Sequence, residues 1–315
     1  MPYQVLVDEP LPDELLSMVA VECEVHVWPA DAAGLAPLLA RAEGLFTYGH
    51  PHVDRGLLDR MPRLRVISNF GVGVDHLDLE AARQRGIPVG NTPGILDGAT
   101  ADLTFALLLA AARNLVVGDR YARSAAFTHY DPNRLLGQEV HGATLGIIGM
   151  GNIGRQVARR ARAFDMRVLY HNRRRNPPAE AALGATYATL PELLRQADFV
   201  TLNVPLTAET RGLIGREQLA LMKPTAMLIN VARGGVVDHA ALLAALQERR
   251  IGGAALDVTE PEPLPRNHPL LQLDNLIITP HLGSATRQTR RQMGELAIAN
   301  LRAGLRGEAL PSRVA

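Results

Sequence analysis

The sequence predicts an α/β protein with two doubly wound parallel-sheet domains, of the Rossmann and flavodoxin-like kind, and an active-site cleft between them. Three observations lead to this prediction. Short runs rich in β-branched residues and leucine alternate with longer helical patterns, these runs form two successive series, and a glycine-rich turn follows the first strand of the second series. A chain of 315 residues is long enough for two domains of ordinary size.

The predicted strands of the first series cover residues 4–7, 24–28, 44–48, 65–69 and 88–90. Those of the second series cover residues 144–148, 167–170, 199–202, 226–230, 253–256 and 276–278. Helical patterns intervene, for example at residues 154–164, 191–197 and 239–249. Strands that alternate with helices in this way predict parallel sheets with helices on both faces.

Two further helices suggest where the domains join. Residues 100–115 read as one long apolar helix, which we expect to be buried between domains or between subunits because nearly every face is hydrophobic. Residues 286–305 form another helical pattern, which we expect to return to the first domain. The predicted boundaries are 1–98 with 287–315 for the substrate (catalytic) domain and 99–286 for the dinucleotide-binding domain.

The composition argues against several kinds of binding partner. The net charge of +1 offers no general attraction for nucleic acid or for a membrane surface. The single cysteine, Cys23, excludes a disulfide framework and a cysteine metal site, and the pair His50 and His52 lacks a third ligand, so no metal is expected. The N-terminus carries no secretory pattern and the longest apolar run is short, so the expected location is the cytoplasm.

The strongest motif is the turn after residues 144–148, which reads Gly149-Met150-Gly151-Asn152-Ile153-Gly154. At this spacing, the first glycine permits a sharp turn, the second lets a pyrophosphate approach the backbone, and the third lets helix and strand pack closely. The following helix would present its amino end to the phosphates. We therefore predict that these six residues bind a nicotinamide dinucleotide; the alternative is a tight turn without a ligand.

The next strand indicates which dinucleotide. About 20 residues beyond such a turn, an NAD site has an acidic residue for the ribose hydroxyl. Here Tyr170 is followed by His171-Asn172-Arg173-Arg174-Arg175, without a carboxylate. Because guanidinium groups suit phosphate, we expect Asn172, Arg173 and Arg174 to contact the cofactor, with NADP(H) preferred and NAD(H) possible. The alternative is a solvated basic loop.

Three segments near the ends of later strands supply an arginine, a carboxylate and a histidine, namely Arg233, Glu262 and His281. In an open α/β sheet the carboxyl ends of the strands face the ligand. Arginine can hold the substrate's carboxylate or carbonyl, histidine can protonate a developing alkoxide, and glutamate can support the charged histidine. These residue types suit the reduction of a 2-keto acid, although each alone also has a structural interpretation.

The sequence is similar to the D-2-hydroxyacid dehydrogenase family over essentially its whole length. Its carboxyl third closely resembles the glyoxylate/hydroxypyruvate reductases, through Asp257-Val258-Thr259, Pro261-Glu262-Pro263-Leu264-Pro265 and His281-Leu282-Gly283-Ser284-Ala285-Thr286. Residues 69–78 resemble the substrate loop of the family. The resemblance implies reduction of glyoxylate, hydroxypyruvate or both, with Arg233, Glu262 and His281 as the catalytic residues.

The resemblance also implies further site residues. Those for the substrate are Val72 and Gly73, whose backbone N–H groups would receive the carboxylate, together with Arg233, Ser284 and Tyr130. Asp257 would hold the nicotinamide carboxamide, and Thr104 would lie near the same ring. The other cofactor residues implied are Asn203, Val204, Pro205, Val231, Ala232, Arg233, His281 and Gly283.

A homodimer is also implied, in which a large aromatic side chain of one subunit enters the active site of the other. Tyr130 occupies the matching stretch where a tryptophan is expected, which leaves the preferred substrate size open. Alternatives within the family are a phosphoglycerate or 2-ketogluconate dehydrogenase. Glu262 argues against a formate dehydrogenase, and Val72-Gly73-Val74 against a phosphite dehydrogenase. A non-catalytic binding protein resembling the corepressors of this fold is the alternative from another class.

Overall fold

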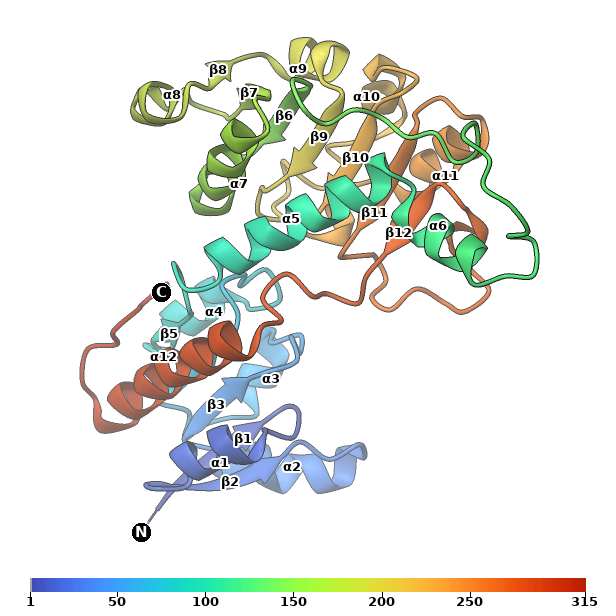
Figure 1. The fold of residues 1–315 in the computed structure, drawn as a ribbon. Coiled ribbons are helices and arrows are strands. Elements are labelled where there is room, and N and C mark those ends of the chain that lie inside the picture. Colours follow the sequence, from blue (N-terminus) through green and yellow to red (C-terminus); the bar gives the residue numbers. More distant parts are fainter. Residues whose placement is uncertain (1) are drawn as a thin grey trace. The chain divides into compact units, whose positions relative to one another are not determined.

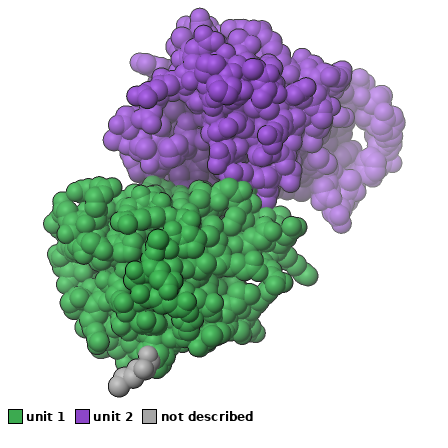
Figure 2. All heavy atoms as spheres, turned by 90° about the vertical axis from the view of Figure 1, so that its left-hand side faces the viewer, with its two compact units in different colours: residues 1–96, 286–315 green, residues 97–285 purple. Residues whose placement is uncertain are grey.

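The computed structural model describes residues 2–315, which form two compact units. Of the described residues, 2–96 and 286–315 form the first unit, and Asp97–Ala285 form the second (Figure 2). Each unit is built on one parallel sheet, so the predicted fold class is confirmed (Figure 1).

The sheet of the first unit has five strands in the order β2-β1-β3-β4-β5, the flavodoxin-like order. Helices α1 and α12 pack together, with α12 against β3 and β4, while α2, α3 and α4 contribute to a separate apolar cluster. The elements of this unit are β1 (Tyr3–Val7), α1 (Asp13–Val19), β2 (Cys23–Val27), α2 (Ala32–Arg41), β3 (Gly44–Thr47), α3 (Arg55–Asp59), β4 (Val66–Asn69), α4 (Leu79–Gln84), β5 (Val89–Gly90) and α12 (Arg287–Arg306).

The sheet of the second unit has seven strands in the order β12-β11-β10-β9-β6-β7-β8, the Rossmann order with one strand added. Its strands are β6 (Thr144–Ile148), β7 (Arg167–His171), β8 (Thr186–Tyr187), β9 (Phe199–Leu202), β10 (Met227–Asn230), β11 (Gly253–Leu256) and β12 (Leu276–Ile278). Its helices are α5 (Asp97–Ala112), α6 (Leu115–Ala122), α7 (Asn152–Ala163), α8 (Pro177–Leu183), α9 (Leu190–Gln196), α10 (Arg216–Leu221), η1 (Gly234–Val236), α11 (His239–Gln247) and η2 (Pro269–Gln272).

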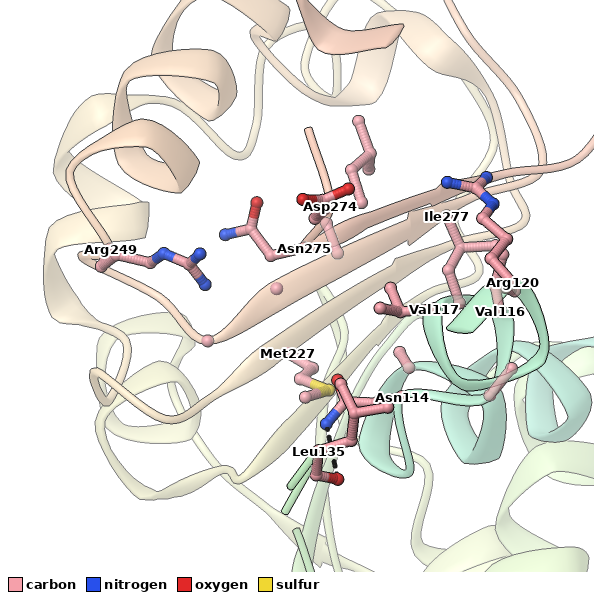
Figure 3. Close-up of a pocket in the computed structure, with 16 residues that line it drawn as sticks. Asn114, Val116, Val117, Arg120, Leu135, Met227, Arg249, Asp274, Asn275 and Ile277 are labelled. Atoms are coloured by element: carbon pink, nitrogen blue, oxygen red, sulfur yellow. Dashed lines mark hydrogen bonds between the residues drawn. The ribbon is translucent and has the colours of Figure 1, made fainter. Parts of the chain in front are cut away.

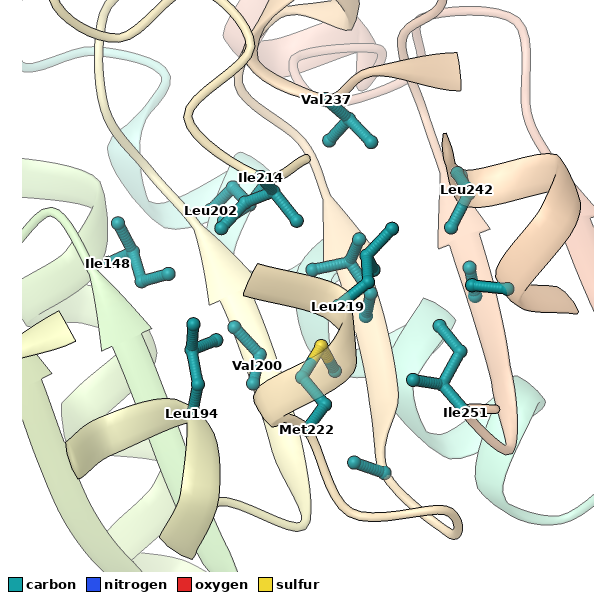
Figure 4. Close-up of a cluster of buried hydrophobic side chains, with 14 of the residues drawn as sticks. Ile148, Leu194, Val200, Leu202, Ile214, Leu219, Met222, Val237, Leu242 and Ile251 are labelled. Atoms are coloured by element: carbon teal, nitrogen blue, oxygen red, sulfur yellow. The ribbon is translucent and has the colours of Figure 1, made fainter. Parts of the chain in front are cut away.

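Helices cover both faces of this second sheet. Leucine, isoleucine and valine side chains of the strands pack with α9, α10 and α11 on one face (Figure 4). On the other face the strands pack against α5, α7 and α8. β6, β9, β10 and β11 are buried almost throughout, which explains why each reads as a continuous apolar run in the sequence.

The structure corrects the expectation of a single helix over residues 100–115. α5 begins earlier, at Asp97, and ends at Ala112. Asn114 adopts a left-handed conformation with φ 52°, and α6 then leaves at a bend of 60°. Asparagine tolerates this conformation better than most residues, so it stops the helix without a glycine. No single helix within residues 2–315 is long and apolar enough to span a membrane, and α5 with α6 meets that criterion only as a bent pair.

Candidate active site

The glycine-rich turn lies where the strand order of the second unit reverses, between β6 and β9. Dinucleotides bind at such switch points in doubly wound sheets. Gly149 has φ 102°, and a Cβ on it would lie 2.7 Å from the carbonyl oxygen of Asn203. A Cβ on Gly154 would lie 2.1 Å from the carbonyl oxygen of Gly149, whereas a Cβ on Gly151 would meet no atom within 4 Å. Gly149 and Gly154 therefore allow the close packing of the turn, and Gly151 leaves open space beside its backbone.

The polar groups around this turn also fit a dinucleotide. No side chain caps the amino end of α7, so its first N–H groups remain available as donors. The N–H of Met150 donates to Oδ1 of Asn172 at 2.7 Å, which ties the turn to the loop after β7. Oδ1 of Asn203 is buried and accepts no hydrogen bond from the described part of the chain. A buried acceptor without a partner in the described chain is consistent with a bound ligand group.

The three arginines of the basic loop after β7 differ in their contacts. Arg175 donates to both carboxylate oxygens of Glu180, at 3.1 and 2.7 Å, and this hydrogen bonding is the main reason why the pKa of Glu180 is lowered. Glu180 also accepts from the hydroxyl of Tyr170 at 2.6 Å. Arg173 and Arg174 are exposed. Arg175 therefore anchors the loop, which leaves Arg173 and Arg174 as the more available cations.

His281 and Glu262 form a direct pair, with 2.7 Å between Nδ1 and Oε1. Both side chains are partly open to solvent, at 34% and 40% exposure. The other carboxylate oxygen of Glu262 accepts from the N–H of Thr259 at 3.2 Å, which orients the carboxylate. Nε2 is therefore the ring nitrogen of His281 that faces away from this partner.

The loop that carries His281 is held by Asp257, at the end of β11. The carboxylate of Asp257 is 1% exposed and accepts from the hydroxyl of Thr279 at 2.6 Å and from the N–H groups of Leu282 and Gly283 at 2.7 and 2.8 Å. His281 itself has a left-handed backbone, with φ 56°. Such a conformation in a non-glycine residue persists where its surroundings fix it, and Asp257 provides that constraint. The cofactor role predicted for Asp257 stays a prediction, and the supporting Thr279 was not predicted from the sequence.

Arg233 follows β10, the strand next to β11. Asn230 holds its turn: its side chain donates to the carbonyl of Arg233 at 2.9 Å and accepts from the N–H of Ala232 at 3.0 Å. A Cβ on Gly234 would lie 2.0 Å from the carbonyl carbon of Thr259, so this turn packs tightly on the loop that carries Glu262. Arg233, Glu262 and His281 therefore belong to three contacting segments at the carboxyl ends of β10, β11 and β12.

The remaining predicted cofactor residues lie in several places of the second unit. Val204 packs against the turn at Gly149, and Pro205 accepts a hydrogen bond from Thr210. Val231 is buried after β10. Thr104 is buried within α5 and donates to the carbonyl of Thr100 at 2.8 Å. Thr100, one turn earlier in α5, lies beside Gly283: its side chain is 3.4 Å from the position of a Cβ on that glycine.

The other predicted substrate residues are distributed over both units. In the first unit, Val72 and Gly73 lie in the loop after β4, and the N–H groups of residues 71–74 donate to no other residue within 2–315. In the second unit, Ser284 is half-buried, and Tyr130 is 80% exposed. Within residues 2–315, no three His, Cys, Asp or Glu side chains are grouped as metal ligands.

The second unit also contains a pocket of about 220 Å³ away from these groups. It is lined by residues at the amino ends of β10, β11 and β12 and by α5 and α6 (Figure 3). Met227, Gly253 and Leu276 are the first residues of these strands. The pocket is thus at the opposite ends of the strands from Arg233, Glu262 and His281.

Comparisons with known proteins identify the family of the chain. The family described as D-isomer specific 2-hydroxyacid dehydrogenase, NAD binding domain, matches residues 105–283. The chain is 46% identical to a glyoxylate reductase of Pyrococcus furiosus, over 99% of this chain and 95% of that protein. A solved structure of a Thermus thermophilus protein is 48% identical with a TM-score of 0.91, covering 99% of both chains.

A second solved structure is the NADPH-dependent glyoxylate/hydroxypyruvate reductase of Sinorhizobium meliloti in complex with NADP and malonate. It is 33% identical with a TM-score of 0.91, and the match covers 100% of this chain and 97% of that one. The chain therefore belongs to the D-isomer specific 2-hydroxyacid dehydrogenase family and is an oxidoreductase with an NAD-binding domain.

Proposed function

We propose that this chain reduces small 2-keto acids, glyoxylate and hydroxypyruvate in particular, with NADPH as the preferred reductant. The observation that carries the proposal is the pairing of His281 with Glu262 at 2.7 Å, on the same sheet edge as Arg233 and Asp257. The relatives named glyoxylate reductase support this choice of substrate. His281 acts as the general acid/base, Arg233 binds the substrate, and Glu262 supports His281.

When bound, the dihydronicotinamide supplies a hydride to the carbonyl carbon of the keto acid. His281 donates a proton from Nε2 to the carbonyl oxygen as negative charge develops there, because Nδ1 faces Glu262. Glu262 fixes the orientation of the imidazole and balances its positive charge before the transfer. Arg233 polarises the substrate, and the backbone N–H groups of Val72 and Gly73 receive its carboxylate. In the direction of oxidation, His281 takes the proton back.

The basic loop supports the preference for NADPH. Within Asn172-Arg173-Arg174-Arg175 no carboxylate competes for the ribose, and Arg175 is already paired with Glu180. We assign the 2′-phosphate to Arg173 and Arg174, with Asn172 fixing the adjoining turn. The similar Sinorhizobium meliloti reductase is NADPH-dependent and was solved with NADP, which supports this choice of cofactor.

We further propose a homodimer in which the segment after α6 covers a second copy of this chain. The segment exposes Phe127, Tyr130 and Leu136, and no residue of α6 is buried. Surface clusters of large apolar side chains are typical of interfaces. Tyr130 then reaches the active site of the partner and limits substrate size. The molecular mass in solution tests the dimer, and the effect of Tyr130→Ala on KM across keto acids of increasing size tests the role of Tyr130.

The function itself is tested by steady-state oxidation of NADPH and NADH with glyoxylate, hydroxypyruvate, 3-phosphohydroxypyruvate and 2-ketogluconate. We expect turnover of the first two, faster with NADPH, and a loss of about 10²- to 10⁴-fold in kcat for His281→Ala. Preference for one of the bulkier acids would assign the chain to another dehydrogenase of the family. If the protein binds NADPH but consumes none with any keto acid, a non-catalytic binding role replaces the proposal.

A further inference from the structure

The loop after β4 has its carbonyl groups held by three side chains of the same unit. The hydroxyl of Thr92 donates to the carbonyl of Phe70 at 2.7 Å. The side-chain amide of Asn69 donates to the carbonyls of Gly71 and Gly73, at 2.7 and 2.9 Å. The side-chain amide of Asn91 donates to the carbonyl of Val72 at 2.8 Å. Four consecutive carbonyls are thus directed at buried donors.

This arrangement determines where the N–H groups of the loop point. Each peptide group is planar and trans, so a carbonyl held on one side turns the N–H of the next residue to the other side. The held carbonyls of residues 70–73 thereby orient the N–H groups of residues 71–74, which donate to no other residue within 2–315. Successive backbone N–H groups of this kind form a site for an anion.

The donors are themselves fixed. Oδ1 of Asn69 accepts from the hydroxyl of Thr47 at 2.7 Å and lies 3.1 Å from Nε2 of His76. These contacts leave the amide nitrogen of Asn69 to face the loop. The backbone N–H of Asn91 donates to the carbonyl of Ser312 at 3.2 Å, and its carbonyl accepts from the side chain of Asn300 at 3.0 Å. The loop is therefore linked through Asn91 to α12 and the segment after it.

We propose that Asn69, Asn91 and Thr92 are positioning residues that set the affinity for the substrate's carboxylate without touching the substrate. The inference rests on the proposed function, in which the N–H groups of Val72 and Gly73 receive that carboxylate. Side chains that only satisfy buried polar groups of the loop affect folding stability alone. Positioning residues, by contrast, affect carboxylate binding more than catalysis or cofactor binding.

The test uses Thr92→Val, which removes the donor at nearly constant volume, and Thr92→Ser, which keeps the hydroxyl as the matched control. Asn91→Asp is a second variant, because it replaces the donor with an oxygen that repels the carbonyl of Val72. The measurements are KM for glyoxylate and hydroxypyruvate, kcat, KM for NADPH, and the affinity for oxamate, an unreactive 2-keto acid analogue, in the presence of NADPH. Thermal unfolding of each variant is recorded alongside.

We expect Thr92→Val to raise KM for the keto acids and to weaken oxamate about 3- to 10-fold, the size of one hydrogen bond. Asn91→Asp should raise KM for the keto acids and weaken oxamate binding, each by about 10-fold or more, because it leaves the carbonyl of Val72 facing a carboxylate. For both variants kcat and KM for NADPH should stay within about threefold, and Thr92→Ser should match the wild type.

Oxamate affinity of wild-type strength in both Thr92→Val and Asn91→Asp would overturn the inference, even if the variants unfold at lower temperature. The same holds if kcat falls while KM stays constant. Failure of the proposed function has a different signature, since the wild type would then neither oxidise NADPH with keto acids nor bind oxamate. That result would remove the inference as well.

Discussion

Nδ1 of His281 faces Oε1 of Glu262 at 2.7 Å, and Asp257 holds the loop that carries this histidine through three hydrogen bonds. Glu262 thereby orients the imidazole ring, and Asp257 fixes the backbone that carries it. Because a proton donor must be aligned with the atom it serves, this double constraint suits His281 for general acid catalysis. In the proposed mechanism, Glu262 and Asp257 therefore act through His281.

The first prediction concerns Glu262→Gln, which keeps the shape of the side chain and removes its charge. We expect kcat to fall about 10- to 100-fold, since the imidazole loses the charge that supports its protonated form. KM for NADPH should not change. Because both side chains are partly exposed, their ion pair contributes little to stability, so the unfolding temperature should fall by no more than about 2 °C. Unchanged kcat in a folded variant would exclude Glu262 from the mechanism.

The second prediction compares alanine at two glycines of the cofactor turn. Gly151→Ala should fold normally, because its Cβ meets no atom within 4 Å, but it should raise KM for NADPH about 10-fold or more by occupying the space for the pyrophosphate. Gly154→Ala should lower the unfolding temperature even without cofactor, because its Cβ would lie 2.1 Å from the carbonyl oxygen of Gly149. Calorimetry with and without NADPH distinguishes the two effects.

A reversal of this pattern, with Gly151→Ala unstable and Gly154→Ala impaired only in binding, would contradict the assignment of open space to Gly151. Equal cofactor affinity in Gly151→Ala and the wild type would show that the pyrophosphate binds elsewhere. Gly184→Ala provides a control outside the turn, since Gly184 has a left-handed backbone at the end of α8 and should lose stability alone.

Much of this fold was predictable from the sequence because both sheets are parallel. Buried parallel strands must be apolar on both faces, so β6, β9 and β11 appear as short continuous runs with the predicted bounds. The two-residue strand β8, Thr186–Tyr187, was not predicted. The break at Asn114 was also missed, because apolar residues continue on either side of it.

The sequence singles out candidate site residues wherever one residue type suits the proposed chemistry, as with His281 and the glycines of the turn. It does not single out the residues that support them. Thr279 and Asn230 act through hydrogen bonds to backbone and carboxylate groups that only the folded chain brings together. Asn91 and Thr92 belong to the loop before α5, and nothing in the sequence of that loop indicates which groups these side chains contact. Their contacts with the loop after β4 depend on the pairing of β4 with β5.

The third prediction separates the arginines of the loop after β7. Replacing Arg173 and Arg174 together by serine should lower kcat/KM for NADPH about 10- to 100-fold and leave that for NADH within about threefold, because only NADPH carries the 2′-phosphate. Arg175→Ser is the matched control: Arg175 pairs with Glu180 and lies over the ring of Tyr187, so its loss should change stability more than cofactor preference. If Arg175→Ser alone abolished the preference, the assignment of the phosphate to Arg173 and Arg174 would be wrong.

The fourth prediction concerns His239, the first residue of α11. Burial is the main reason why the pKa of His239 lies below its usual value of 6.5. Nδ1 lies 3.1 Å from the carbonyl oxygen of Glu260, and Nε2 is buried without a partner within residues 2–315. Above pH 6.5 both the folded and the unfolded chain keep this imidazole neutral. As the pH falls below that value, the unfolded chain binds a proton that the folded chain resists, so folding stability decreases.

His239→Asn should therefore reduce the acid sensitivity of the protein. Asparagine supplies an N–H donor for the carbonyl of Glu260 but does not titrate. Between pH 7.5 and pH 5.5, both chosen around the usual histidine pKa, the unfolding temperature should fall less in the variant than in the wild type, by about 1–3 °C. The exposed His52 provides the control, and His52→Asn should leave the pH dependence unchanged. An equal loss of unfolding temperature on acidification in His239→Asn and the wild type would mean that the buried imidazole does not contribute to acid sensitivity in this pH range.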